Sequence, residues 1–282
     1  MLCRGLGVNK KNGIVKYGLD FIPGAVDSCV AFFSYYRSSR HFKGQCVEIM
    51  RGSDYATAWF GYKGSLGYID YIAIALFCSG TTGKVKTWVN GSVLAGNNAV
   101  QNNYANMPII YESGTFNADG LKFVIASSNY MSIVDYAGIQ IIEPPLTIYA
   151  NAKISSSHVG YYLYKGLDST INSTYGIYNS NLANPQEIGI ILKDFENYAN
   201  QESDTIIEAW TSKAANGLKI KSSTTETLLT YGINTTNYNN VYLGCRADAA
   251  LTRSRYLNGN IKSIIIFNSN QYDNYTQLAS KF

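Results

Sequence analysis

Short apolar stretches separated by Gly and Asn dominate this chain from residue 121 onward. In residues 241–245, apolar positions alternate with Tyr242 and Gly244, which is the period of an extended strand. The turn residues Asn258–Asn260 then lead into an apolar run over Ile261–Phe267. Stretches this short, with period-two alternation and frequent turn residues, predict an all-β sandwich rather than a helical or α/β fold.

The same pattern predicts a series of strands in one domain. They are expected at Leu121–Ile125, Tyr130–Val134, Leu146–Ile154, Val159–Lys165, Tyr175–Tyr178, Ile188–Leu192, Asp204–Thr211, Gly217–Lys221 and Val241–Cys245. We interpret Pro144-Pro145 as a break between strands, because the segments before it are too irregular to form a closed core alone. Residues 25–282 are therefore expected to form a single β-sandwich domain. Residues 1–24 are expected to form an N-terminal arm.

The N-terminal half is expected to add one or two short helices. Val30, Phe33 and Tyr36 recur at helical spacing, which predicts a helix between residues 26 and 42. The length and the alanines of Tyr68–Cys78 favour a second, buried helix. Three strands complete this half, at Cys46–Arg51, Ala58–Tyr62 and Lys84–Val89.

Composition excludes several functions. The formal net charge is only +4 and the basic residues are scattered, so nucleic acid is not an expected partner. Five cysteines without a CxxC pair argue against a disulfide framework and a zinc site, and no metal or cofactor is expected. No apolar stretch is long enough for a membrane span or a signal peptide, which predicts folding in a reducing cytoplasm and no membrane partner.

Several motifs in a fixed order resemble the sandwich domain of glycoside hydrolase family 54, the α-L-arabinofuranosidases. They are Cys29-Val-Ala, Ser34-Tyr-Tyr-Arg37, Arg51-Gly-Ser-Asp54, Phe77-Cys-Ser-Gly-Thr-Thr82, Trp88-Val89 and Gly96-Asn-Asn-Ala-Val-Gln101. In the second half, Tyr242-Leu-Gly-Cys-Arg246 and Tyr256-Leu-Asn-Gly-Asn-Ile261 resemble concanavalin A-like, laminin-G-like lectin domains. The resemblance implies one concanavalin A-like jelly roll over about residues 24 to 270.

The resemblance also implies a catalytic pair. Lys193-Asp-Phe-Glu-Asn197 places Glu196 at the position of the nucleophile, and Leu243-Gly-Cys-Arg-Ala-Asp248 places Asp248 at that of the general acid. A retaining glycosidase holds two such carboxyl groups roughly 5–5.5 Å apart. Other family features are missing. The adjacent cysteine pair of the sugar pocket has no equivalent, Asn90 stands where the family has Asp, and Gly83 replaces the cysteine that would pair with Cys78.

Candidate sugar-binding residues are Trp88, Asn90, Tyr162, Tyr164 and Arg246. Tyrosines on neighbouring predicted strands, at positions 161, 162, 164, 175 and 178, could form a stacking platform on a concave face. The arginines at positions 246, 253 and 255 could bind sugar hydroxyls or an acidic glycan, or pair with Asp248. The tryptophans Trp59, Trp88 and Trp210 all fall in strand patterns, which favours core packing.

These observations lead to one main hypothesis and two alternatives. The domain type resembles virion proteins of bacteriophages, which favours a structural head or tail-fibre protein with possible binding of surface glycans. Its partners would be other virion proteins through the N-terminal arm, host-surface glycan and further copies of the chain. It would be located in the virion, assembled in the host bacterial cytoplasm. The alternatives are a retaining α-L-arabinofuranosidase-like hydrolase and a bacterial surface lectin.

Overall fold

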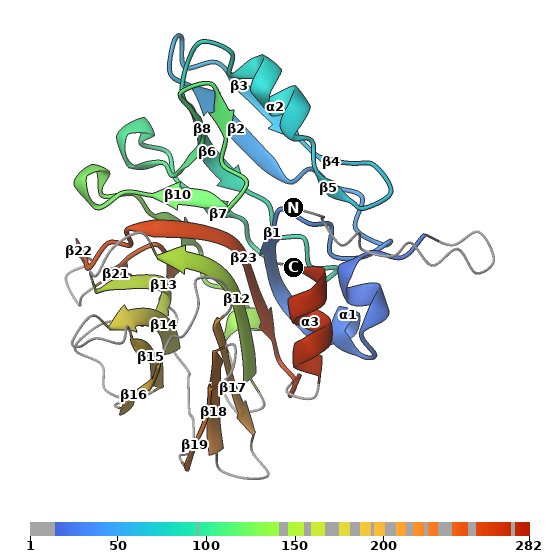
Figure 1. Ribbon diagram of the computed structural model, residues 1–282, viewed down its shortest axis with the longest axis vertical. Coiled ribbons are helices and arrows are strands. Elements are labelled where there is room, and N and C mark those ends of the chain that lie inside the picture. The colour runs from blue at the N-terminus through green and yellow to red at the C-terminus, as the bar shows by residue number, and fades with distance from the viewer. Residues whose placement is uncertain are drawn as a thin grey trace.

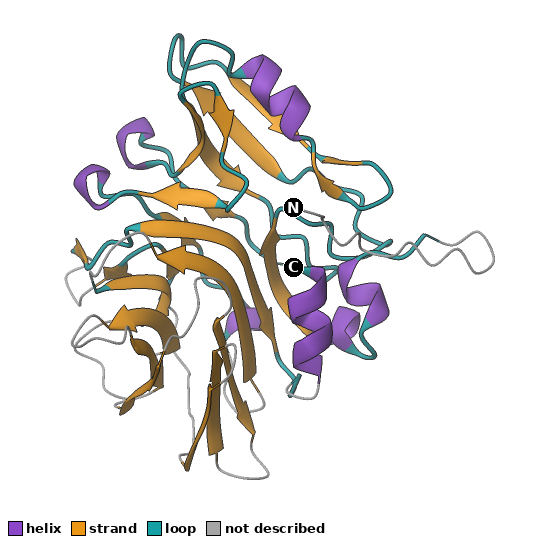
Figure 2. Cartoon of the chain, in the orientation of Figure 1, coloured by secondary structure: helices purple, strands orange, loops and turns teal. Residues whose placement is uncertain are grey.

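The computed structural model is mostly β, with few helices (Figure 2). It describes residues 15–94, 96–140, 146–154, 159–166, 175–180, 187–192, 195–200, 207–212, 217–222, 225–230, 239–247, 252–271 and 274–282. Between residues 179 and 230 the description covers only the backbone of the strands. Among these residues, no helix is both long and apolar enough to cross a bilayer.

The first layer is built around one long strand near the end of the chain, β23 (Gly259–Phe267). On one side β23 pairs with β12 (Leu146–Ile154), and on the other with β1 (Cys29–Ser34) and β10 (Leu121–Phe123). Figure 1 shows β23 and β12 curving side by side. The layer continues from β12 through β17 (Ile207–Ser212), β18 (Gly217–Ser222) and β19 (Thr225–Thr230).

The second layer is a longer antiparallel series. In spatial order its strands are β16 (Phe195–Asn200), β15 (Glu187–Leu192), β14 (Tyr175–Ser180), β13 (Gly160–Lys165), β20 (Val241–Leu243), β11 (Met131–Ile133), β7 (Ala99–Val100), β6 (Gly83–Trp88), β2 (Val47–Arg51) and β3 (Thr57–Phe60). Strand β8 (Ile109–Glu112), with β9 (Thr115–Phe116) beside it, pairs with both β6 and β10 and so joins the two layers.

Both layers contribute to one large hydrophobic core. Ile264 and Ile266 of β23 share this core with Leu163 of β13 and Leu243 of β20. Alternate residues of β23, Ile265 and Phe267, belong to a second cluster on the other side of the strand. Because the second half of β23 is buried on both faces, its sequence there is a continuous apolar run, Ile264–Phe267, rather than an alternating one.

Short helices and the chain end cover the second face of β23. They are a 3-10 turn at Gly18–Phe21, α1 (Ala25–Ser28) and α3 (Tyr275–Lys281), and Figure 1 shows α1 and α3 next to each other beside β1. The Phe282 ring lies 5.2 Å from that of Phe32 in an edge-to-face contact. Residues 18–22, part of the predicted arm, thus pack against the sheet through Leu19 and Ile22.

The predicted helix between residues 26 and 42 is wrong. Only Ala25–Ser28 is helical, and Cys29–Ser34 forms β1, in which every residue is buried. The apparent helical spacing arose because β1 has apolar contacts on both faces. The other predicted helix is present as α2 (Tyr71–Phe77), which begins after a capping bond from the Ala73 amide to the Asp70 carboxylate. The expectation that it is buried is wrong, because Ile74 is its one buried residue, whereas Ile72 and Leu76 are exposed. The short strands β4 (Tyr62–Lys63) and β5 (Tyr68–Ile69) precede it.

Candidate functional site

The second layer turns one face to the core and the other face outward. Cross-strand pairing links seven residues on the outward face into a line, because paired residues of antiparallel strands project to the same side. This line, the outer row, consists of Trp59, Glu48, Thr87, Val100, Ser132, Tyr242 and Tyr164. Their chain neighbours, such as Phe60, Val47, Trp88 and Leu243, lie in the main core. Seven strands at about 4.8 Å spacing give the row a length of about 29 Å along the sheet.

An exposed aromatic ring stands at one end of the outer row. Trp59 is 49% exposed, whereas the next residue, Phe60, is buried. The expectation that Trp59 packs in the core is therefore wrong. The signal was present in the sequence, since two adjacent aromatic residues in a strand must point to opposite faces and only one can reach the core.

Charged and hydroxyl groups follow Trp59 along the row. The buried Glu48 carboxylate accepts hydrogen bonds from Lys86 Nζ at 3.0 Å and from Thr87 Oγ1 at 2.8 Å. Lys86 is the extra residue of a bulge in the pairing of β6 with β2, which explains how two consecutive residues can reach the same carboxylate. Glu48 is thus held in place by two partners.

Two arginines cover the other end of the row. They belong to the small hairpin of β21 (Arg246–Ala247) and β22 (Arg253–Ser254). The Arg246 guanidinium carbon lies 5.9 Å from the Tyr164 ring centre and 6.0 Å from that of Tyr161. Arg246 is half-buried, and the rings beneath it are buried and provide cation–π stabilisation.

The second arginine repeats this arrangement. Arg253 lies 4.4 Å from the Tyr130 ring centre and 5.6 Å from that of Tyr242. Burial raises the pKa of Tyr242, and the Arg253 cation acts in the opposite direction without cancelling the effect. The tyrosine therefore stays neutral and presents a π face to the guanidinium.

The structure separates the predicted sugar-binding residues into three groups. Trp88 and Tyr162 are fully buried in the main core and turn no ring face to solvent, so sugar stacking does not fit their position. Asn90 is a structural hub: its Oδ1 accepts from the amides of Phe32 and Ser92, at 2.9 and 3.0 Å. Only Tyr164 and Arg246 lie together on the outward face, and there the buried ring supports the arginine instead of forming an exposed platform.

Of the two implied catalytic residues, Glu196 lies in a described strand and Asp248 lies outside the described residues. Glu196 is the second residue of β16, and only its backbone is described. Its pairing runs through Ile191 and Gly176 to Tyr164, so the backbone of Glu196 continues the outer row three strands further, about 14 Å along the sheet. Asp248 falls outside the described residues, immediately after Ala247 of β21.

Gly83, where the resemblance to the arabinofuranosidases implies a second cysteine, lies beside Cys78. Cys78 is buried and forms no disulfide, and a Cβ atom placed on Gly83 would lie 2.4 Å from its Sγ. Burial raises the pKa of Cys78 to about 11, and the nearby Arg51 cation acts in the opposite direction. The thiol is thus protonated near neutral pH, and a glycine fills the position from which a second cysteine could reach it.

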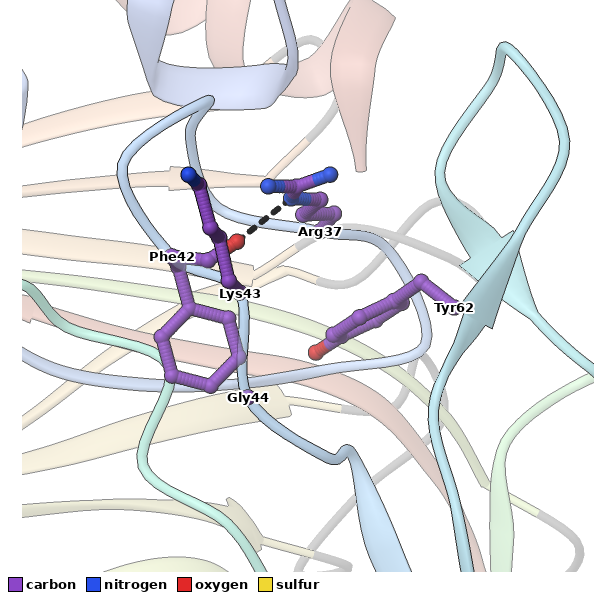
Figure 3. A pocket seen from close by; sticks show the side chains of 5 residues that line it. All are labelled: Arg37, Phe42, Lys43, Gly44 and Tyr62. Carbon is purple, nitrogen blue, oxygen red and sulfur yellow. Dashed lines mark hydrogen bonds between the residues drawn. The ribbon is translucent and has the colours of Figure 1, made fainter.

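A pocket of about 260 Å³ lies apart from the outer row. Figure 3 shows its lining residues: Arg37, Phe42, Lys43 and Gly44 come from one loop, and Tyr62 comes from β4. The Phe42 and Tyr62 rings are nearly perpendicular, with centres 6.2 Å apart. Two cationic side chains and two aromatic rings therefore line one small cavity.

Comparison with known proteins identifies the fold. No family model matches the sequence, and no curated protein matches it. A GH54 α-L-arabinofuranosidase soaked with a cyclic sulfate inhibitor superimposes with a TM-score of 0.67 at 16% identity over 91% of this chain and 64% of that one. An arabinofuranosidase complexed with arabinofuranosyl-α-1,2-xylobiose gives a TM-score of 0.62 at 17% identity over the same shares. The chain thus spans 64% of the length of these enzymes. It has the all-β, concanavalin A-like jelly-roll fold that they share.

Proposed function

We propose that this chain is a carbohydrate-binding jelly-roll protein that holds a glycan along the outer row. The observation that carries the proposal is the half-exposed Trp59 ring in one cross-strand line with polar groups and with the arginines at the far end. The fold shared with the arabinofuranosidases supports it, because one of those enzymes was solved in complex with arabinofuranosyl-α-1,2-xylobiose.

Each part of the outer row would make a different contact. The exposed face of Trp59 can stack on the apolar face of a sugar ring. Lys86, whose side chain is 30% exposed and whose Nζ bonds the Glu48 carboxylate, supplies a cationic donor close to it. Arg246 and Arg253 supply several donors in a fixed plane, and because tyrosine rings already restrain them, they lose less entropy on binding.

Glycan-array screening of the folded chain, followed by calorimetry on the best ligand, tests the proposal. Trp59→Ala should weaken binding about tenfold or more, as expected for loss of an aromatic anchor. The matched control is Tyr71→Ala, which removes a similarly exposed aromatic ring, 48% exposed, that is not part of the row. A flat array, or equal affinities for the two variants, would contradict the proposal.

A second candidate function is retaining glycoside hydrolysis, favoured by the register that places the Glu196 backbone in line with Tyr164. Hydrolysis requires the Asp248 carboxyl roughly 5–5.5 Å from that of Glu196. The substrate to test is 4-nitrophenyl α-L-arabinofuranoside, with which one of the similar enzymes was soaked. Release of nitrophenol that is abolished in both Glu196→Gln and Asp248→Asn, but not in Glu187→Gln, would support it. Activity that survives both substitutions would exclude this pair.

The more specific prediction made from the sequence, that this chain is a structural protein of a bacteriophage particle, rests on the sequence alone. Neither the fold nor the comparisons add support to it, and a surface lectin would use the outer row in the same way. Mass spectrometry of purified particles tests the prediction directly. Absence of this chain from particles made by a phage that encodes it would refute the virion assignment and leave glycan binding unaffected.

A further inference from the structure

The pocket beside β4 has a separate ligand chemistry. Its wall is the loop of residues 37–44, which Arg37 holds together from within. Arg37 Nε donates to the carbonyls of Ser39 at 3.1 Å and Phe42 at 2.5 Å, and Nη2 donates to that of Arg40 at 3.2 Å. The guanidinium also stacks 4.3 Å from the Tyr17 ring centre. Because these contacts fix the loop, the pocket is preformed.

Positive charge is concentrated at this pocket without compensation. Arg37 and Lys43 line it, and among the described residues neither takes part in an ion pair. The exposed Arg40 adds a third cation, and its Nε donates to His41 Nε2 at 3.1 Å. The carboxylate of Asp20 accepts from the backbone amides of Arg40 and Tyr17 and does not line the pocket. An anion would therefore be attracted to this site.

The aromatic lining and the size indicate more than a bare ion. Phe42 and Tyr62 form two perpendicular walls, as Figure 3 shows. Tyr62 donates its hydroxyl to the Ser34 carbonyl at 3.3 Å, and burial raises its pKa, so it is a neutral ring. A volume of about 260 Å³ is several times the roughly 30 Å³ share of a water molecule and lies below the usual range of drug-sized sites. One ring-sized ligand fits.

We infer that this pocket binds a single carboxylated sugar unit of the uronic acid type. The carboxylate would contact Lys43 and the remaining Nη1 donor of Arg37, which donates to none of the described residues, while the apolar face of the sugar would lie on Phe42 and Tyr62. Gly44 allows this arrangement, because a Cβ atom there would come within 2.8 Å of the Phe42 ring. The site shares no residue with the outer row.

The test is a titration of the full chain with D-glucuronate, followed by saturation-transfer NMR. Binding should saturate and should weaken with salt. D-glucuronamide, which lacks the charge, should bind at least about tenfold more weakly. Lys43→Gln should reduce glucuronate affinity about threefold, as for an exposed ionic contact. Gly44→Ala should reduce it further by displacing the Phe42 ring. The matched control Lys153→Gln removes an exposed lysine of β12 and should change nothing.

Two results would overturn the inference. One is the absence of saturable glucuronate binding by the folded chain. The other is displacement of glucuronate by inorganic phosphate at equal affinity, which would mean a bare anion site. Trp59→Ala separates this site from the outer row, because it should leave glucuronate binding unchanged even though it weakens glycan binding along the sheet.

Discussion

A buried ion pair at one end of the sandwich offers the most direct test of the fold. Lys165 of β13 is fully buried, and its Nζ lies 2.5 Å from Oδ1 of Asp135, whose side chain is 11% exposed. The ammonium also donates to the Asn239 carbonyl at 2.7 Å. The pair thus joins the end of β13 to the segment after β11 and to the segment before β20.

Asp135→Asn should destabilise the protein by about 3–5 kcal/mol, because it leaves the Lys165 charge buried without a counter-charge. Lys165→Met should cost less, about 1–2 kcal/mol, because the charge is removed and the chain volume is kept. The remaining Asp135 would then keep its hydrogen bond from Gln140 and some contact with water. The order of the two effects is the prediction, and it follows from the difference in burial between the partners.

The pH dependence follows from the same pair. Burial lowers the pKa of Lys165, and Asp135 acts in the opposite direction. Between the folded pKa and the unfolded value of about 10.4, the unfolded chain binds more protons, so this group makes stability rise with pH. In Asp135→Asn the folded pKa falls further. The stability difference from the unmodified chain should therefore shrink as the pH rises through the lowered pKa of Lys165 in the variant.

Urea denaturation followed by circular dichroism measures these effects, with the double variant completing a thermodynamic cycle. Tyrosine and cysteine titration is common to all variants and cancels in the differences. The reasoning would be refuted if Asp135→Asn cost less than about 1 kcal/mol, or if Lys165→Met proved the more destabilising of the two.

Three further predictions concern single positions. Asn90→Ala should lower the free energy of unfolding by about 2–4 kcal/mol in urea denaturation, because two buried amides lose their acceptor. Asn97→Ala, at a more exposed position, should lower it by less than about 1 kcal/mol, and equal losses would contradict the role assigned to Asn90. Gly120→Ala should cost about 3 kcal/mol or more, because its Cβ would lie 2.4 Å from the Ile261 backbone at a φ of +119°. Gly64→Ala, at φ +73° with open space around it, should cost only about 1–2 kcal/mol, and the reverse order would refute this account. Gly83→Cys should form a disulfide with Cys78 under oxidising conditions, detectable by mass spectrometry and stabilising the protein by about 2 kcal/mol; persistence of two free thiols would show that the positions are not within bonding reach.

Strand patterns in the second half were predictable because those segments have a strong β-branched and aromatic bias. Leu146–Ile154 was predicted with the bounds that β12 has, and Val241–Cys245 contains β20. The strand β1 was mistaken for a helix, because burial on both faces removes the alternation that distinguishes a strand. Whether this segment follows the helical or the strand period depends on its pairing with β23, which lies more than two hundred residues later in the chain.

The candidate site was predictable only in part for a related reason. Tyr164 and Arg246 were identified as residue types suited to sugars, and the structure brings them together. Trp88 and Tyr162 have the same chemistry but fall on the core side of their strands, a difference of one residue in register. The outer row itself could not be derived from composition, because it combines seven strands whose order in space differs from their order in the sequence.

The central position of β23 has a consequence for how the chain reaches this structure. Its partners β1, β10 and β12 are all synthesised earlier, and each has a hydrogen-bonding edge that, among the described strands, pairs with β23. Pairing over such sequence separations is slow, since a long loop must close before any contact forms. A nascent chain that lacks residues 259–267 would expose three strand edges at once, the condition under which β proteins associate with one another. Rapid completion of synthesis, or a chaperone that shields those edges, should therefore determine the yield of folded protein more than the stability of the finished sandwich does.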